Sequence, residues 1–393
     1  MKSLALSVLS ASVVAVRIYA AAPIRSDDTD VNPHDRTVYL PTVERQVNEH
    51  FHVVHNPKTG RHLAFWTQES WEGSSDIHIM FTRSSDGGRT WSAPRLLWGS
   101  PSLTSGVANA AYQLPMVSRS GRVYCVWNQC VRPGRGRGDG VMMGACSDDD
   151  GETWTTPAKI MEERHWCCWQ RPLRLASGNR FLTAVSIASQ KSAKTAFFRF
   201  ENIDDDPDAQ DVRVTVIGDG NRLEGEEASL VKLPDGRLFA VMRSRFGHPL
   251  WTVSGDGGET WSASRPLKDE TGAVIRHPRA PCPIYDLDGD DAASGSYFAL
   301  FTDTYDPKIS QWHGRGPLFR YSGTFDPKSE QPVKFSKDKL LMPRTASSHY
   351  GNSCYSSYTV VGDERTLWYP DNKRRLYGAL ISARESNGAV APR

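Results

Sequence analysis

Three acidic side chains recur at the same place in a short motif and are the first candidates for chemistry in this sequence. Asp86, Asp149 and Asp256 each occupy the third position of an S-x-D-x-G-x-T-W box. An Asp at this position hydrogen-bonds local backbone N–H groups, the Gly accepts a positive φ, and the Trp packs between neighbouring sheets. The boxes therefore predict hairpin turns whose aspartates are structural rather than catalytic.

Cysteines and clustered aspartates are the other residues whose types suggest chemistry. The seven cysteines lack the paired C-x-x-C spacing of a zinc site, so metal ligation by them is not expected. Cys125 and Cys130 flank an expected strand end and could form a disulfide, whereas vicinal Cys167 and Cys168 would be strained if joined to each other. The aspartates within 286–291 resemble part of a calcium loop but lack its downstream Glu, so we interpret them as an acidic turn.

The boxes also reveal the repeat that must position any site. They begin at residues 84, 147 and 254, which corresponds to one repeat and then two of roughly fifty residues. Short alternating strands, such as 62–66 and 122–127, lie between Gly, Asp and Asn turns. Four strands per repeat form a blade of a β-propeller, which is an all-β fold.

The number of blades follows from the expected innermost strands. Their starts are predicted near residues 50, 111, 169, 227, 280 and 355, which favours six blades. The strand at 37–40 is expected to close the last blade. The stretch 280–345 is long and poorly patterned, so seven blades is the alternative.

The domain organisation follows from this repeat and from the first residues. A chain of 393 residues usually holds more than one domain, but stacked repeats make residues 49–393 a single propeller, preceded by an arm at 23–48. Residues 1–22 have the basic start, apolar run and small-residue cluster of a secretory signal. We therefore predict a secreted, extracellular protein.

Composition excludes several classes of partner. Lys and Arg number 47 against 45 Asp and Glu, without a basic run, so nucleic acid is not an expected partner. After the leader, no apolar segment is long enough to cross a membrane, so no membrane partner is expected either. We expect a monomer.

Three boxes on repeats of this size resemble the sialidase-like, Asp-box β-propellers, and the resemblance runs over residues 49–385. The boxes are specific for this fold and carry no information on chemistry. In that superfamily the site lies on the propeller axis, where the innermost strands begin. Sialidases place there three arginines that bind a carboxylate, a Tyr nucleophile paired with a Glu, and an Asp acid.

Three segments resemble parts of that site. The segment from Glu227 to Arg243 is similar to the one that carries the sialidase Glu and second arginine, and Arg279 begins one similar to that of the third arginine. Tyr355 begins a segment similar to that of the Tyr nucleophile. The resemblance therefore implies that Glu227 and Tyr355 are catalytic and that Arg243 and Arg279 bind a carboxylate. The alternatives are a salt-bridged strand end for Arg243 and a packing role for Tyr355.

Two positions depart from the sialidase pattern. Counting back from the hairpin at 60–65 places His50 where sialidases have their first arginine. The region of the acid, Trp71 to Asp76, is not a clear match, with Glu72 the nearer candidate and Asp76 expected in a strand. The loss of an arginine argues against ordinary sialidase action, although His50 could also be a hydrogen-bonded structural imidazole.

Two arginines with a His, a Tyr and a Glu suit β-elimination on a uronic acid. The arginines would neutralise the carboxylate and acidify the neighbouring C5–H. His50 could take that proton, while Tyr355 or the same His protonates the departing O4. No cofactor is expected, because this chemistry needs only charge neutralisation and a proton shuttle.

Among Asp-box propellers the chain is most similar to the L-rhamnose-α-1,4-D-glucuronate lyases, which remove terminal rhamnose from glucuronate on arabinogalactan side chains. The resemblance implies the same activity here, with an acidic oligo- or polysaccharide as the substrate. Two alternatives remain open. One is a retaining sialidase-type hydrolase that uses Tyr355 and Glu227, and the other is a non-catalytic glycan-binding propeller.

Other predicted strand starts supply further binding candidates. Tyr112 and Gln113 in the second blade offer an aromatic face and an amide, and Arg171 in the third offers a guanidinium. Such groups match the apolar face and hydroxyls of a sugar. Arg171 is either another carboxylate partner or a surface arginine. His349 is expected in a loop at the rim, as a second candidate base.

Overall fold

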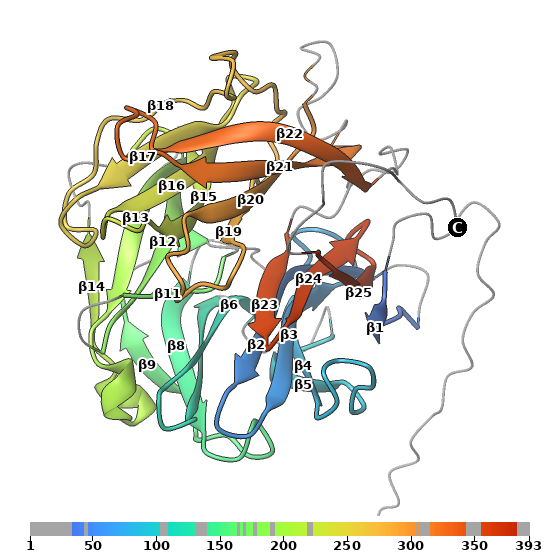
Figure 1. Ribbon diagram of the computed structural model, residues 1–393. Helices are drawn as coiled ribbons and strands as arrows, with labels where there is room; N and C mark the ends of the chain where they lie inside the picture. The colour runs from blue at the N-terminus through green and yellow to red at the C-terminus, as the bar shows by residue number, and fades with distance from the viewer. Residues whose placement is uncertain are drawn as a thin grey trace, which may run out of the picture.

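The molecule is a ring of six antiparallel β-sheets around one axis (Figure 1). The computed structural model describes residues 34–42, 46–102, 109–130, 140–162, 166–167, 170–175, 179–188, 193–217, 223–303, 305, 315–342 and 355–382. Each sheet is a four-stranded blade, apart from the third, whose inner edge is divided between two short strands. The prediction of an all-β propeller with six blades is confirmed, and the seven-blade alternative is wrong.

The strands follow the chain from blade to blade. The first blade holds β2 (Val47–Asn56), β3 (Arg61–Glu69), β4 (His78–Ser84) and β5 (Arg95–Gly99). The second holds β6 (Ala110–Val117), β7 (Val123–Cys130), β8 (Gly140–Ser147) and β9 (Ala158–Met161). The third holds β10 (Trp166–Cys167), β11 (Leu173–Arg174), β12 (Phe181–Ala188), β13 (Ala193–Phe200) and β14 (Val214–Ile217).

The remaining blades complete the ring. The fourth holds β15 (Glu226–Lys232), β16 (Leu238–Arg243), β17 (Leu250–Ser254) and β18 (Arg265–Pro266). The fifth holds β19 (Ile284–Asp286), β20 (Ser296–Phe301), β21 (Leu318–Phe325) and β22 (Val333–Met342). The last holds β23 (Ser357–Val361), β24 (Glu364–Asp371), β25 (Arg375–Leu380) and β1 (Arg36–Tyr39). Two 3-10 turns, η1 (Ile203–Asp205) and η2 (Ala209–Asp211), lie between β13 and β14.

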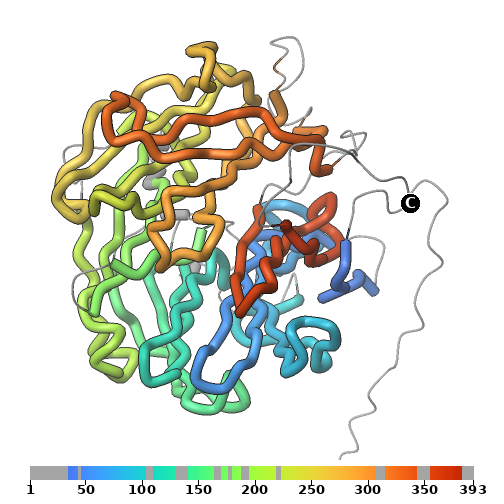
Figure 2. The backbone as a smooth tube through the Cα atoms, in the orientation of Figure 1, coloured from blue at the N-terminus to red at the C-terminus, as the bar shows by residue number. Residues whose placement is uncertain are grey.

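The N-terminal strand closes the ring, as predicted. β1 pairs antiparallel with β25, with Thr37 opposite Tyr377, and it forms the outer edge of the last blade. Figure 2 shows the blue first blade beside the red last blade, so the two ends of the fold meet. This pairing fixes the two ends of the fold in one sheet, because a strand from the N-terminal part completes the blade formed by the C-terminal part.

Each box forms the predicted turn. The Asp86 carboxylate accepts hydrogen bonds from the backbone N–H of Thr90 at 2.9 Å and from its hydroxyl at 2.5 Å, while the Ser84 hydroxyl donates to it at 2.8 Å. Asp149 and Asp256 accept the same bonds in their own boxes. The hydrogen bond from Thr90 lowers the pKa of Asp86. All three carboxylates therefore serve structure rather than chemistry.

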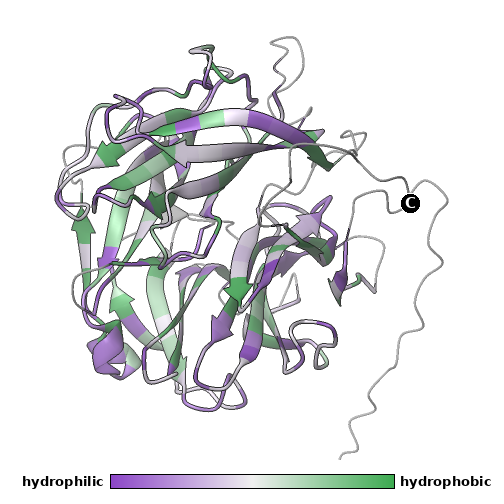
Figure 3. Cartoon of the chain, in the orientation of Figure 1, coloured by the Kyte–Doolittle hydropathy of each residue, from purple (hydrophilic) through white to green (hydrophobic). Residues whose placement is uncertain are grey.

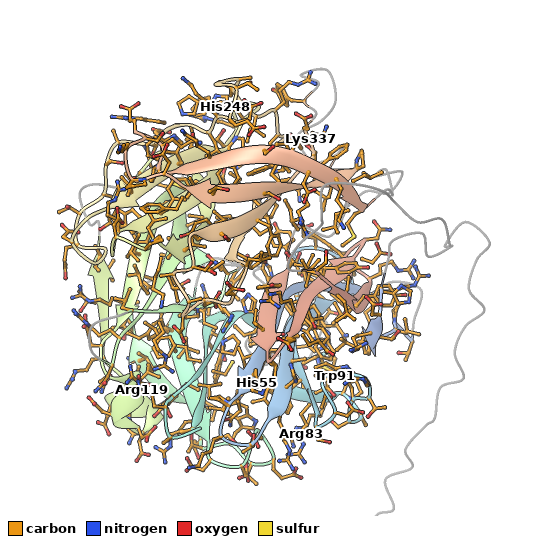
Figure 4. All side chains as sticks on the ribbon, viewed as in Figure 1. His55, Arg83, Trp91, Arg119, His248 and Lys337 are labelled. Carbon is orange, nitrogen blue, oxygen red and sulfur yellow. The ribbon has the colours of Figure 1, made fainter. Side chains whose placement is uncertain are left out.

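The box tryptophans pack against the preceding blade. At Gly88, where φ is +78°, an added Cβ would lie 2.4 Å from the ring of Trp368 in the last blade, so only glycine allows this approach. Trp91, labelled in Figure 4, meets Trp368 edge to face. The box contacts and their ring-centroid distances are Trp91 with Trp368 at 5.7 Å, Trp154 with Phe81 at 6.1 Å, and Trp261 with Phe197 at 4.2 Å.

The core lies between neighbouring sheets, and Figure 3 shows apolar segments along the strands with polar colour concentrated in many of the turns. Side chains also join the innermost strands where main chains do not pair. Four of these inter-blade bonds link Gln113 to the His50 carbonyl, Gln170 to the backbone of Leu230, Ser229 to the backbone of Ile284, and Ser357 to the N–H of Val53. Side-chain hydrogen bonds therefore connect neighbouring blades around the axis.

Buried cysteines in the described residues are thiols. Cys125, Cys146 and Cys282 are free and buried, and burial raises the pKa of the Cys125 thiol well above its usual value. The disulfide considered between Cys125 and Cys130 is therefore absent. In the described part of the chain, no helix has the length and apolar character needed to traverse a bilayer. The proposed leader, residues 1–22, lies outside the described residues.

Candidate active site

Three innermost strands carry the same irregularity near their first residues. In β2, β6 and β15, the pairing register shifts so that two residues lie opposite one on the neighbouring strand. The first residue of each bulge has a left-handed backbone: His50 with φ of 49°, Tyr112 with φ of 58° and Glu227 with φ of 48°. Such conformations are unfavourable for these residue types and occur where a side chain must be aimed. All three are buried.

These bulges mark one end of the propeller axis. We call the end where the innermost strands begin the start end, and the opposite end the far end. His50, Tyr112, Glu227 and Tyr355, which precedes β23, all belong to the start end. The His50 ring lies 4.7 Å from that of Tyr112 and 5.1 Å from that of Tyr355, edge to face in both cases. Residues from three blades therefore meet at this point.

Two arginines and two glutamates form a shared ion-pair network beside this aromatic group. Arg243, at the end of β16, places Nη2 2.9 Å from Glu226 Oε2 and Nη1 2.7 Å from Glu227 Oε2. Arg279 places Nη2 2.5 Å from the other oxygen of Glu226. Burial opposes ionisation of Glu226, but Arg243 and Arg279 outweigh it and lower its pKa. Glu226 thus fixes the two guanidinium groups side by side.

The arginines retain capacity to bind an anion. The Arg243 Nε has no hydrogen-bond partner among the described residues, and the Arg279 side chain is 27% exposed. A guanidinium has five N–H donors, and two adjacent guanidinium groups suit a planar carboxylate. Both arginines that the resemblance implied as carboxylate ligands therefore lie together at the start end.

Tyr355 and Glu227 form a hydrogen-bonded pair. The Tyr355 hydroxyl donates to Glu227 Oε2 at 3.4 Å. Burial raises the pKa of Glu227, and the charge of Glu226 adds to this effect against the opposing Arg243. Burial and Glu227 also raise the pKa of Tyr355 to about 12, although Lys373, Arg243 and Arg315 oppose them. The phenol is consequently protonated at neutral pH and can act as a proton donor.

His50 has a carboxylate neighbour on its own strand. Its Nδ1 lies 3.4 Å from Glu49 Oε1, and the Glu49 side chain is fully buried. Lys373, in the turn between β24 and β25, places Nζ 2.7 Å from Glu49 Oε2 and 2.8 Å from Glu72 Oε2. The same Nζ lies 5.0 Å from the centre of the Tyr355 ring. A chain of charges therefore runs from Glu72 through Lys373 and Glu49 to His50.

The sequence analysis missed four members of this site, because their sequence signals are weak or absent. Glu49 and Glu226 adjoin residues that were selected, but neither belongs to a motif. Arg315 is buried and acts electrostatically on Glu227 and Tyr355. Lys373 follows Asn372 in a turn where both have positive φ, and the only available sign was an Asp-Asn-Lys turn between two strands.

Some predicted site residues take other roles. The Gln113 amide is bonded to the Thr67 hydroxyl at 2.8 Å and to the His50 carbonyl, so it joins two blades instead of facing a sugar. Asp76 is not in a strand, since it lies in the turn before β4 and accepts from Ser70 N at 3.1 Å. Glu72 is exposed and reaches the site through Lys373. His349 lies outside the described residues.

Arg171 lies nearer the far end of the axis than the start end, away from Arg243 and Arg279. The third blade begins with β10 at Trp166, so Arg171 is already close to β11 and the far end. It pairs with Asp290, and its Nη2 lies 3.4 Å from the Tyr358 carbonyl. Arg171 therefore does not lie beside Arg243, because the third blade begins at Trp166 and not near residue 169.

The far end contains a cavity of about 900 Å³ whose lining includes Arg171. His55 and Arg119, both labelled in Figure 4, also line it. His55 follows His50 by five residues in β2, which places the two ends about 15 Å apart at the rise of an extended strand. Each mouth of the axis thus has its own set of charged residues.

The described residues contain no group of three or more His, Cys, Asp or Glu side chains arranged to hold a metal ion. The acidic turn at 286–291 is engaged within the protein. Asp286 accepts from the Ser294 N–H at 2.8 Å, Asp288 pairs with Arg365 at 2.6 Å, and Asp291 pairs with Lys232 at 3.2 Å. Its interpretation as a turn agrees with these contacts.

The fold and the boxes define a sialidase-like propeller of the Asp-box type. Residues 60–318 match the model of the BNR repeat-like domain, and the chain belongs to this family. No curated protein sequence matches the chain significantly.

Solved structures with this architecture include several sialidases. The Hadza microbial sialidase Hz136 superposes with a TM-score of 0.62 at 17% identity, over 85% of this chain and 66% of that one. A mutant of the NanB sialidase from Streptococcus pneumoniae gives 0.64 at 14% identity, over 91% and 73%. A Dyadobacter fermentans protein of unknown function gives 0.63 at 13% identity, over 90% and 99%. At these identities the similarity establishes the fold alone.

Proposed function

We propose that this protein is a secreted polysaccharide lyase that releases terminal L-rhamnose from glucuronic acid by β-elimination. The contact between the His50 and Tyr355 rings, 5.1 Å apart at the start end, carries the proposal. It joins a candidate base to a candidate acid beside two arginines. The site would accept the acidic end of an arabinogalactan-type glycan.

Each group has a role in a balanced elimination. Arg243 and Arg279 bind the uronate carboxylate and stabilise the negative charge that develops next to C5. His50 removes the C5 proton, the C4–C5 double bond forms, and the bond from C4 to the bridging oxygen breaks. Tyr355 gives its proton to that oxygen, so rhamnose leaves with an intact hydroxyl, and no water is consumed. A proton transfer from His50 to Tyr355 then restores both groups.

The arrangement suits the stereochemistry of glucuronate. In a 4-linked glucuronate, the C5 hydrogen and the C4 oxygen lie on the same face of the ring. Base and acid must therefore approach from one side, as adjacent side chains would. The protonated state of Tyr355, whose pKa burial raises to about 12, supports its role as acid.

A second candidate, a retaining sialidase-type hydrolase, is favoured by one contact. The Tyr355 hydroxyl lies 3.4 Å from Glu227 Oε2, as a nucleophile and its base would. Three features weaken this candidate. Burial raises the pKa of Glu227, which disfavours the ionised form that a base requires, His50 replaces an arginine, and Asp76 is occupied in a turn.

The experiment is digestion of a rhamnose-capped glucuronate oligosaccharide with continuous ultraviolet detection. The lyase proposal predicts growth of the absorbance of a conjugated unsaturated uronate in step with free rhamnose. Release of rhamnose without that absorbance would refute it in favour of hydrolysis. Binding without release would support a glycan-binding propeller instead.

A further inference from the structure

The Lys373 side chain is a buried cation at the start end that the proposed mechanism does not use. It is 4% exposed, although lysine is rarely buried without a partner. Its backbone is left-handed, with φ of 51°, and its carbonyl accepts a hydrogen bond from the N–H of Asn48 at 2.7 Å. The Asn48 amide also donates to the Arg374 carbonyl at 2.6 Å. Asn48, one residue before Glu49, thereby joins the β24–β25 turn of the last blade to the first blade by two hydrogen bonds.

The charges around Lys373 come from three elements. Glu49 on β2 lies 2.7 Å from its Nζ, and Glu72 on the β3–β4 loop lies 2.8 Å away. Tyr355, before β23, presents its ring face to the cation at 5.0 Å. The two carboxylates differ in burial, since the Glu49 side chain is 0% exposed and that of Glu72 is 35% exposed. The pairing with Glu49 is therefore the more strongly desolvated of the two.

Glu49 is held between a cation and an imidazole. One carboxylate oxygen faces Lys373 and the other lies 3.4 Å from His50 Nδ1. This contact is electrostatic, since its geometry is not that of a hydrogen bond. The negative charge beside Nδ1 favours the tautomer with the proton on that nitrogen, so that Nε2 carries the lone pair. Without Lys373, the fully buried Glu49 would lose the cation that lies 2.7 Å from its carboxylate and would draw a second proton onto the imidazole more strongly.

We propose that Lys373 is a positioning residue that holds Glu49 against Nδ1 of His50 and thereby keeps His50 neutral with Nε2 as the base. The role of His50 as a base rests on the proposed function, whereas the arrangement of charges around His50 is present without substrate. Lys373 does not correspond in sequence to the arginine that His50 replaces, because Lys373 and His50 lie near opposite ends of the chain. It restores a cation near the position where His50 stands in place of an arginine.

The same cation acts on Tyr355. Glu227 raises the pKa of this phenol together with burial, while Lys373, Arg243 and Arg315 oppose them. Loss of the Lys373 charge would therefore strengthen the hold of Tyr355 on its proton and slow its transfer to the leaving oxygen. Both proton-transfer partners of the reaction would thus respond to one substitution.

The test is a titration of histidine side chains by nuclear magnetic resonance, without substrate. A His50→Gln variant identifies the His50 signals. In Lys373→Met, the midpoint of the His50 titration should rise by about one pH unit or more, because Glu49 then stabilises the imidazolium without the opposing charge of Lys373. Lys373→Arg should return the midpoint towards its wild-type value. An unchanged midpoint in folded Lys373→Met overturns the inference.

Two further variants keep the test decisive. Glu72→Gln removes the exposed partner and leaves the Lys373–Glu49 pair, so its midpoint should stay near that of the wild type. Should Lys373→Met fail to fold, Glu49→Gln tests the same contact from the other side. It should lower the midpoint, because the carboxylate that stabilises the imidazolium is gone, and an unchanged midpoint there overturns the inference.

Kinetics separate this inference from the proposed function. In Lys373→Met, kcat on a lyase substrate should fall by about 100-fold, in the range of lost acid–base catalysis, while KM changes by less than about threefold because the arginines remain. A wild-type protein that forms no unsaturated product would refute the lyase, while the titration would still decide the role of Lys373.

Discussion

The two ends of the propeller axis carry similar residue types in different arrangements. At the far end, Arg171 pairs with Asp290, and Asp291 is shared by Lys232 and Arg174, but the described innermost strands run there without a register shift. At the start end, Arg243 and Arg279 share Glu226, and three bulges hold side chains in left-handed conformations.

The difference indicates which end performs chemistry. Ion pairs at a partly exposed mouth contribute little to stability, and those of the far end are formed without strained backbone. A buried network of shared charges, supported by strained backbone, is costly and persists where function requires it. A charged cluster at the mouth of a channel is therefore weak evidence of a site, whereas strain and shared partners together are strong evidence.

The largest effect is expected from the arginines of the start end. Arg243→Ala should lower kcat/KM by about 1000-fold, because a preorganised donor to the developing charge is lost. It would also leave Glu227 without its closest cation, so thermal unfolding must be measured alongside. Arg279→Ala, at a more exposed position, should lose activity by a similar factor with little change in the unfolding temperature. A folded Arg279→Ala protein with full activity would remove the carboxylate site.

Tyr355→Phe is expected to have the next largest effect. The change removes one hydroxyl and should lower kcat by about 100-fold or more, as for a missing general acid. Because the pKa of Tyr355 is raised to about 12, the wild-type phenol stays protonated through the ordinary tyrosine range. The rate should therefore not fall near pH 10, where a free tyrosine ionises. A wild-type rate that rises with ionisation of the phenol, with no such rise in Tyr355→Phe, would instead speak for a phenolate nucleophile.

A structural contrast is provided by the boxes. Trp91→Ala should lower the free energy of unfolding by about 2–4 kcal/mol, since an aromatic side chain packed between blades is replaced by a methyl group. The ring is only partly buried, so the lower part of that range is expected. Chemical denaturation measures this loss. Reduced activity at unchanged stability would mean that the boxes are not the structural turns described above.

The smallest effect is expected at the far end. Arg171→Ala should change kcat/KM by less than about threefold and stability by about 1 kcal/mol or less, as for a partly exposed ion pair. It is the matched control for Arg279→Ala, since each removes one partly exposed arginine at a mouth of the same axis. Strong loss of activity in Arg171→Ala alone would reverse the assignment of the two ends.

Local sequence signals predicted the fold well. The boxes combine turn chemistry with a Trp contact between blades, so one motif determined both the hairpins and the packing of the ring. The closing strand was recognisable because its alternation is that of an ordinary strand. The third blade was harder, since its innermost strand is split into β10 and β11. Its start was predicted near residue 169 and lies at Trp166, so Arg171 was considered for the start end although it lies nearer the far end.

The site was only partly predictable. His50, Glu227 and Tyr355 were found through segment resemblance and do meet on the axis. Glu49, Glu226, Arg315 and Lys373 were missed. Glu226 gains its role from Arg243 on the neighbouring strand and Arg279 before the next blade, whereas Lys373 meets Glu49 from the other end of the chain. Lys373 approaches Glu49 because the turn between β24 and β25 lies against the first blade, where its backbone accepts hydrogen bonds from Asn48. No local pattern encodes that contact.

The most direct test of the account is a reaction in heavy-oxygen water, with both products weighed by mass spectrometry. Elimination through His50 and Tyr355 consumes no water, so neither rhamnose nor the uronate product should carry the label at early times, and their masses should sum to that of the substrate. Incorporation of one heavy oxygen into a product during cleavage, with the masses summing to substrate plus water, would contradict the lyase mechanism and identify the protein as a hydrolase.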